Sequence, residues 1–110
     1  MLFAPIPPHN TFVGAESAGN GVVTGTHNVG LGAETLYRLT SGVSNVSIGY
    51  QALSFLTTGS SNVAIGREAL ENTTASNNTA VGHQAGYANT TGTQNVAMGA
   101  FALGANTTAS

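Results

Sequence analysis

The sequence contains no cysteine, aspartate or lysine, and each absence removes a class of catalytic site from a single chain. Without cysteine there is no thiol nucleophile, without lysine no Schiff base, and without aspartate no Ser-His-Asp triad. Paired carboxylates would have to be Glu68 and Glu71, which we expect to be solvated because they lie on a polar segment. The chain is therefore predicted not to be an enzyme and to use no cofactor.

Charge is scarce as well. Charged residues make up 5% of the chain, where a globular domain has roughly a quarter. The formal net charge is −2 and the cations are Arg38 and Arg67, so no basic stripe for nucleic acid is expected. Neither a membrane-spanning segment nor a signal peptide is predicted, because the long apolar runs that both need are missing. The apolar share of 41% nevertheless argues against simple disorder.

A short phrase recurs along the 110 residues: asparagine, a small or β-branched residue, a small residue, an aliphatic residue and glycine. The phrases begin at Asn10, Asn28, Asn45, Asn62, Asn78 and Asn95, at intervals of 18, 17, 17, 16 and 17 residues. A unit this small cannot bury its own apolar face, so it must stack on a neighbour. The predicted fold class is all-β, a parallel β-roll or β-helix solenoid of about six coils of 16–18 residues over residues 10–110.

Side chains within each phrase alternate between the two faces of a strand. The fourth slot is aliphatic throughout: Val13, Leu31, Ile48, Ile65, Val81 and Met98. The third slot is small in five phrases, as Gly30, Ser47, Ala64, Ala80 and Ala97, with Phe12 as the exception. The two columns indicate two buried faces, one that fills the coil and one that lets something else approach closely.

The rest of each coil is a bend followed by a short segment and a polar loop. The glycine that ends the phrase predicts the bend. The segments that follow, such as AETL, YQAL and REAL, are too short to stand alone as helices, so a second short strand or a turn is expected. Threonine pairs in the loops are predicted to form turns and side-chain ladders. Ice binding is the competing interpretation, disfavoured because adjacent threonines on a strand point to opposite faces.

Residues 1–9 break the repeat and are predicted to be an extended docking arm, which inserts into a partner or caps the first coil. A frayed terminus is the alternative. The candidate docking residues are Leu2, Phe3, Pro5, Ile6, Pro7 and Pro8. For residues 10–110, a thin solenoid would have a poor core and open strand edges, which copies of the chain would cover. Closed symmetry allows two or three copies, and the rod shape favours a homotrimer.

Candidate contacts with other molecules lie in the slot after the glycine. Tyr50, Arg67 and His83 share this slot and are predicted to be exposed surface contacts. Aromatic candidates for carbohydrate contact are Tyr37, Tyr50, Tyr87, Phe55 and Phe101, although Tyr37 and Phe55 are favoured to cover the coil edge instead. No metal site is predicted in one chain, because His9, His27 and His83 lack ligand spacing; a threefold axis would triple any histidine that faced it.

The phrases NVSIGYQAL, NVAIGREAL and NTAVGHQAG, joined by TTGSS and NTTASN linkers, resemble the repeats of phage tail fibres. They are also similar to the head repeats of trimeric autotransporter adhesins such as the Yersinia adhesin. The resemblance covers about residues 10–110 and is more specific for fold than for function. It implies a homotrimer of left-handed parallel β-rolls or related β-helices that serves in attachment to cell surfaces.

The resemblance implies a non-enzymatic virion structural protein, a short phage tail fibre located in the phage tail. Its partners would be copies of itself, other tail or baseplate proteins bound through the N-terminal arm, and a host-surface glycan. The chain differs from the adhesins in lacking a secretion signal, a heptad stalk and an anchor barrel, and from long fibres in lacking a receptor-tip or chaperone domain. Two alternatives stay open: the head fragment of a secreted bacterial adhesin, and a purely structural spacer.

Overall fold

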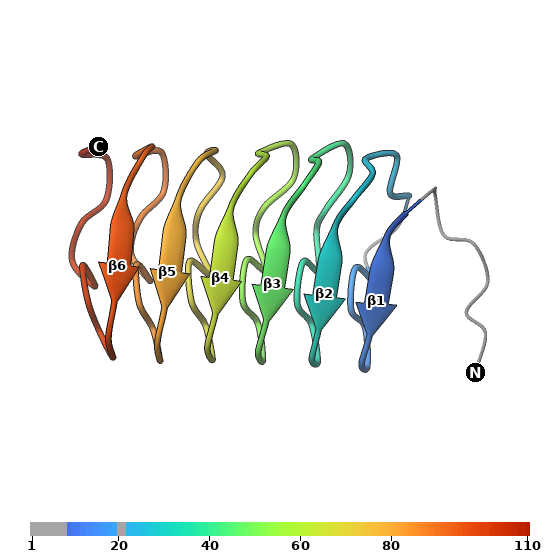
Figure 1. Ribbon diagram of the computed structural model, residues 1–110, viewed down its shortest axis with the longest axis horizontal. Coiled ribbons are helices and arrows are strands. Elements are labelled where there is room, and N and C mark those ends of the chain that lie inside the picture. The colour runs from blue at the N-terminus through green and yellow to red at the C-terminus, as the bar shows by residue number, and fades with distance from the viewer. Residues whose placement is uncertain (1–8, 20–21) are drawn as a thin grey trace.

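The computed structural model describes residues 9–19 and 22–110, and it places six short strands in one parallel sheet. The strands are β1 (Thr11–Val13), β2 (Val29–Leu31), β3 (Val46–Ile48), β4 (Val63–Ile65), β5 (Thr79–Val81) and β6 (Val96–Met98). Each strand pairs with the next one along the chain, slot against equivalent slot, so Val46 lies beside Val63 and Ile48 beside Ile65. The result is an all-β solenoid of about five turns, with one strand in each of its six coils (Figure 1). The predicted solenoid and its register are confirmed, and the homotrimer stays a prediction.

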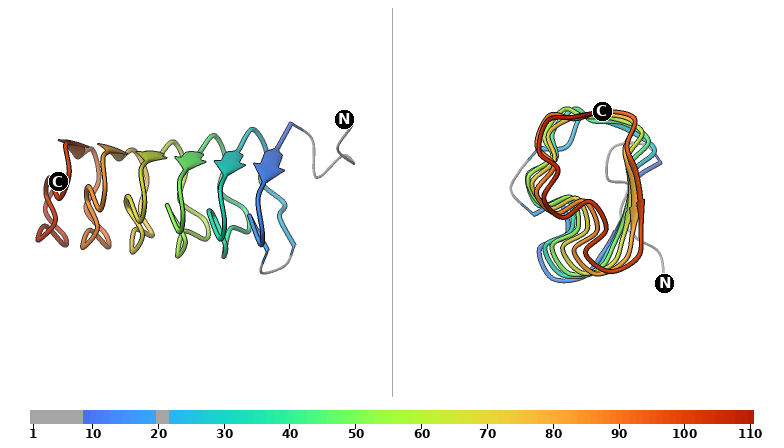
Figure 2. Two further views of the ribbon diagram at one scale, coloured as in Figure 1. Left: turned by 90° about the horizontal axis from the view of Figure 1, so that it is seen from below. Right: turned by 90° about the vertical axis from the view of Figure 1, so that its left-hand side faces the viewer.

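The solenoid is a short rod that measures 38 × 21 × 18 Å. Viewed end-on, successive coils nearly superimpose, with a straight wall that carries the strands and an opposite wall that folds inward (Figure 2). We call the folded segments, residues 33–39, 50–56, 67–73 and 83–89 with residues 15–19 and 100–106 of the end coils, the turn wall. Within the described residues no helix is long and apolar enough to cross a bilayer.

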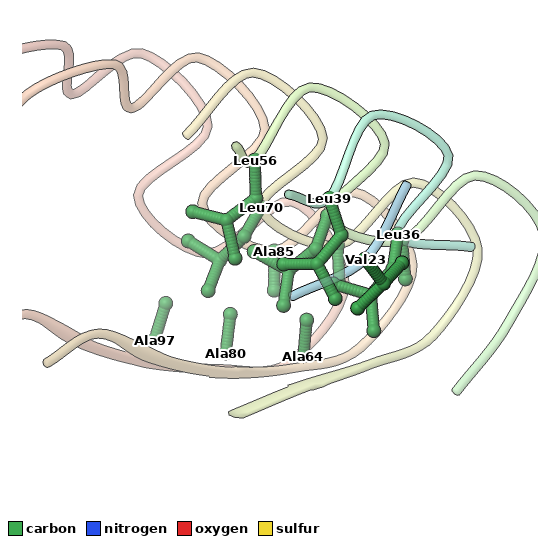
Figure 3. Close-up of a cluster of buried hydrophobic side chains, with 12 residues drawn as sticks. Val23, Leu36, Leu39, Leu56, Ala64, Leu70, Ala80, Ala85 and Ala97 are labelled. Carbon is green, nitrogen blue, oxygen red and sulfur yellow. The ribbon is translucent and has the colours of Figure 1, made fainter. Parts of the chain in front are cut away.

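The core of the rod lies between the two walls. Leu36, Leu53 and Leu70 of the turn wall are buried, and so are Ala64 and Ala80 of the strands. Figure 3 shows the strand alanines pointing toward the leucines across the interior. The small column of the phrase therefore faces into the coil, where its size leaves room for the leucines that approach from the opposite wall.

The asparagine that opens each phrase joins neighbouring coils through its side-chain amide. Asn45 Nδ2 donates to Asn28 Oδ1 at 3.1 Å and to the Gly59 carbonyl at 3.0 Å, and the Asn45 backbone N–H donates to the same Asn28 Oδ1 at 3.0 Å. Asn62 repeats this arrangement on Asn45. Asparagine suits the position because its amide donates and accepts at once. One side chain thus closes its own coil and fixes the register of the next, and we call the column formed by Asn28, Asn45, Asn62 and Asn78 the asparagine ladder.

The bend after each strand requires glycine. In all six coils this residue has a φ between 110° and 134°, where a side chain would strain the backbone. A Cβ on Gly66 would also lie 2.5 Å from the carbonyl oxygen of Gly82 in the next coil. Glycine is therefore required at this position for two reasons: the chain turns sharply there, and the backbone of the next coil lies too close for a side chain.

The turn wall is a turn and not a second strand or a helix. Its path uses left-handed residues that are not glycine, such as Gln51 with φ 59° and Leu53 with φ 51°. Each such residue costs about 1–2 kcal/mol. Hydrogen bonds between coils, such as Leu53 N–H to the Ala69 carbonyl at 3.1 Å, offset that strain. The local conformation is thus stabilised by the neighbouring coil, which supplies the acceptor.

The threonine loops form the predicted side-chain ladder. The Thr40 hydroxyl donates to the Thr57 carbonyl at 3.1 Å, and Thr74 Oγ1 donates in the same way to the Thr90 carbonyl at 3.2 Å. Because each hydroxyl reaches the coil that follows it, these threonines tie adjacent coils together at the outer corner of the rod. The prediction of side-chain ladders in the loops is confirmed.

Candidate functional site

The outer side of the sheet is an uncharged, largely aliphatic surface that we call the outer sheet face. It consists of the second and fourth slots of the six phrases: Thr11, Val13, Val29, Leu31, Val46, Ile48, Val63, Ile65, Thr79, Val81, Val96 and Met98. Every one of these side chains is half-buried or exposed, up to 71% for Met98. Their two columns run the length of the rod beside one another.

Of the two faces that the sequence predicts to be buried, one is buried within the single chain, and burial of the other against another molecule stays a prediction. In the single chain the small column is buried inside the coil, whereas Val13, Leu31 and Ile65 of the aliphatic column are exposed on the outside. The reason is that leucines of the turn wall fill the interior, so the strands contribute only small side chains there. The aliphatic column is left facing outward, and contiguous apolar patches of this kind mark interaction sites.

The structure brings Tyr50, Arg67 and His83 together on three consecutive coils, and we call them the surface strip. All three are exposed, as predicted. The Arg67 guanidinium carbon lies 5.5 Å from the centroid of the Tyr50 ring, and the His83 ring packs edge-on against Phe101 with centroids 5.2 Å apart. These contacts align cationic and aromatic groups along the rod. Their role as contacts for another molecule stays a prediction.

A row of alternating acids and amides lies beside the surface strip. Gln51 Nε2 donates to Glu34 Oε1 at 2.8 Å, and Gln84 Nε2 donates to Glu68 Oε1 at 2.6 Å. Arg67 Nε lies 4.0 Å from the same Glu68 oxygen. Alternation separates the carboxylates of Glu34 and Glu68 by a glutamine, which avoids stacking like charges on adjacent coils. The row therefore holds Glu68 in place beside Arg67.

Glu71 is buried, so the expectation that both Glu68 and Glu71 are solvated is wrong for Glu71. The residue is 8% exposed, and its Oε1 has no hydrogen-bond partner among the described residues. Burial raises the pKa of the Glu71 carboxyl, and the charges of Glu68 and Glu34 raise it further. Coils stacked on both sides cover this segment of the fourth coil, and the polarity of a single coil does not reveal that covering.

The histidines outside the surface strip form a separate feature at the start of the solenoid. The His9 and His27 rings stack with centroids 4.9 Å apart and an angle of 22° between their planes. Across residues 9–19 and 22–110 no group of three or more histidine, cysteine or acidic side chains is arranged to hold a metal ion.

The remaining candidates fall into two groups. Tyr37, Phe55 and Tyr87 are half-buried, and the Arg38 guanidinium carbon lies 4.5 Å from the centroid of the Phe55 ring. The candidate docking residues Leu2, Phe3, Pro5, Ile6, Pro7 and Pro8 lie outside the described residues. The docking arm therefore stays a prediction.

Two surfaces of the described chain are thus candidates for interaction, the outer sheet face and the surface strip. The outer sheet face holds no titratable group, whereas the surface strip carries Tyr50, Arg67 and His83. No protein-family model matches the sequence, and no curated protein or solved structure matches the chain.

Proposed function

We propose that this chain is a non-enzymatic structural protein of a virion, in which three copies form the shaft of a short phage tail fibre. The outer sheet face is the observation that supports this proposal most. It is largely aliphatic over the six strands, with Thr11 and Thr79 as its polar members, and carries no charge, so water contact is costly along the length of the rod. A second and a third copy of the chain would remove that cost.

Copies of the same chain suit this face because of its regularity. Side chains recur at the strand spacing of about 4.8 Å, so a parallel copy presents the same columns with the same period. Each chain has two apolar columns, typified by Val63 and Ile65, and can offer one column to each of two neighbours. A closed ring of three satisfies all the columns and leaves no apolar face open.

The remaining surfaces have roles in the same assembly. The N-terminal arm would bind a tail or baseplate protein, and the sides of the shaft would meet the host cell surface. Three identical sides convert weak single contacts into useful avidity. The contribution of the chain is then mechanical and multivalent, and requires no reaction.

The oligomeric state tests the shaft. We expect native mass spectrometry and light scattering to give the mass of three chains for the intact protein. Ile65→Lys should lower the mass to that of one chain, because it places a charge on the outer sheet face and desolvates it in the trimer. Thr58→Lys, a matched change on the exposed loop corner, should leave the trimer intact. An unmodified protein with the mass of one chain would contradict the proposed assembly.

Cell binding separates a fibre that contacts its host from a structural spacer. Fluorescently labelled trimer is expected to bind cells of the bacterial host, and the single-chain Ile65→Lys protein should bind them at least tenfold more weakly because avidity is lost. A trimer that binds no cells would favour the spacer.

A further inference from the structure

We infer that the surface strip binds an acidic glycan, with Arg67 pairing to a sugar carboxylate and Tyr50 contacting a sugar ring. This inference rests on the proposed function, since it names the class of ligand that the sides of the shaft would meet. The strip lies at one slot of three consecutive coils, while the same slot in the other coils holds Ala15, Ala33 and Ala100. Large side chains are thus gathered in the middle of the rod.

Arg67 supplies the element that selects for acid. Its side chain is 60% exposed, and its nearest acid is Glu68, at 4.0 Å from Nε. Within the described residues its terminal nitrogens donate to no protein acceptor, so the outer edge of the guanidinium fork is open. A planar carboxylate pairs with such a fork through two parallel hydrogen bonds. A hydroxyl cannot supply that geometry, so a carboxylated sugar is favoured over a neutral one.

Tyr50 and His83 supply the rest of the site. Tyr50 is 42% exposed and lies on one side of Arg67, and His83 lies on the other side, each one coil away. With coils about 4.8 Å apart, the strip spans about 10 Å. An aromatic ring presents an apolar body and its hydroxyl a polar tip, which matches the mixed character of a sugar. The strip therefore offers an aromatic surface and hydrogen-bonding groups on either side of the charge.

The strip is organised before any ligand arrives. Arg67 is positioned between the Tyr50 ring and Glu68, and Glu68 is itself held by Gln84 Nε2 at 2.6 Å. The backbone of the strip is fixed by hydrogen bonds between coils, from the Glu68 N–H to the Tyr50 carbonyl at 2.8 Å and from the Gln84 N–H to the Arg67 carbonyl at 2.9 Å. Little conformational entropy is then lost on binding, which favours affinity at a shallow surface.

Binding of a short uronic acid oligomer tests the inference. The probe is a trimer of galacturonic acid, and its control is the same trimer with methyl-esterified carboxylates, measured by calorimetry on the intact protein. We expect at least tenfold tighter binding of the acid form, weakened by added salt. Arg67→Lys should weaken binding of the acid form at least tenfold, because the charge remains but the fork is lost.

Arg38 provides the matched control, since it also lies over an aromatic ring, at 4.5 Å from the Phe55 centroid. Arg38→Lys should leave binding unchanged. The chain has two arginines, so its NMR spectrum contains two arginine Nε–Hε signals, and Arg38→Lys assigns them. Only the Arg67 signal is expected to shift on titration. Equal binding of acid and ester, or equal losses in the two lysine variants, would overturn the inference.

The same samples separate failure of this inference from failure of the proposed function. If the protein has the mass of three chains but binds the acid and the esterified sugar equally, the glycan site is overturned and the proposed fibre shaft is not. A protein with the mass of one chain overturns the shaft, and the NMR titration still decides the site, because the strip lies within a single chain. Circular dichroism of each variant checks that the solenoid is folded.

Discussion

The turn wall is filled differently in the two halves of the solenoid. In the second and third coils the slot before the threonine loop holds Leu39 and Leu56, which are 2% and 0% exposed. In the fourth and fifth coils the same slot holds Thr73 and Asn89, which are 0% and 2% exposed. Burial is equal in the two halves, while the chemistry changes from apolar packing to hydrogen bonding.

The polar half tolerates burial because its groups are bonded to one another. Thr73 Oγ1 donates to the Asn89 carbonyl at 3.1 Å, and Asn89 Nδ2 donates to Thr73 Oγ1 at 3.1 Å and to the Gly92 carbonyl at 3.1 Å. Buried polar groups with partners cost little. The comparison teaches that the opposite wall, with its asparagine ladder and glycine bends, sets the shape of the coil. The buried side chains of the turn wall can then be either apolar or polar and hydrogen-bonded.

Removing one rung of the asparagine ladder from each half is expected to have the largest effect. Asn45→Ala and Asn78→Ala each remove an amide that closes its own coil and accepts the backbone N–H of the next asparagine. We expect each to cost about 3–6 kcal/mol of unfolding free energy, because buried partners lose their bonds. Urea unfolding followed by circular dichroism measures the cost.

Both substitutions should destabilise the chain, and Asn45→Ala should cost more, because Asn45 also bonds side chain to side chain with Asn28 and Asn62, whereas Asn78 Nδ2 donates to the Ser76 carbonyl. Thr58→Ala on the exposed corner is the control and should change little. A ladder that mattered in only one half would show that the turn wall, and not the strand wall, sets the coil.

A matched pair of substitutions in the turn wall sharpens the comparison directly. Leu56→Ala should cost about 2–5 kcal/mol, because it leaves a cavity in a fully buried site. Thr73→Val keeps the shape but loses the hydroxyl, and should cost about 1–2 kcal/mol. Both are measured by urea unfolding at one protein concentration. If Thr73→Val cost more than Leu56→Ala, the polar half would depend on its hydrogen bonds more than the leucine half depends on packing.

Glu71→Gln is expected to have the smallest effect and concerns the fourth coil alone. Burial, with Glu68 and Glu34, raises the pKa of the folded carboxyl above 4.5. The folded chain therefore binds the proton more tightly than the unfolded chain does. This group's contribution to stability is complete below pH 4.5 and is lost as the pH rises through the folded pKa.

The amide stays neutral, so Glu71→Gln should be more stable than the unmodified chain at pH 7 and should flatten this part of the pH profile. Thermal unfolding from pH 4 to pH 8 measures both effects. Glu68→Gln is the comparison: its amide oxygen can still accept from Gln84 Nε2, and it removes only one of the charges that raise the Glu71 pKa, so it should flatten the profile less. A profile unchanged by Glu71→Gln would contradict the raised pKa.

Particular residues show how much the sequence predicts. The phrase beginning at Asn62 predicted a strand, its register and a bend at Gly66, because period-two alternation and glycine are local signals. The exposure of Tyr50, Arg67 and His83 followed from their shared slot. The asparagine ladder could have been predicted because all six phrases begin with asparagine, and few residues can replace a buried amide that both donates and accepts hydrogen bonds.

The sequence by itself determined the period, the parallel pairing of strands and the bends, because each of these depends on residues near one another in the chain or on exact repetition. Only the tertiary structure decided which column faces inward and that Glu71 is covered. Both depend on what the opposite wall and the adjacent coils contribute to the same space. The leucines of the turn wall fill the interior, so the strands have their small side chains inside and their aliphatic side chains outside.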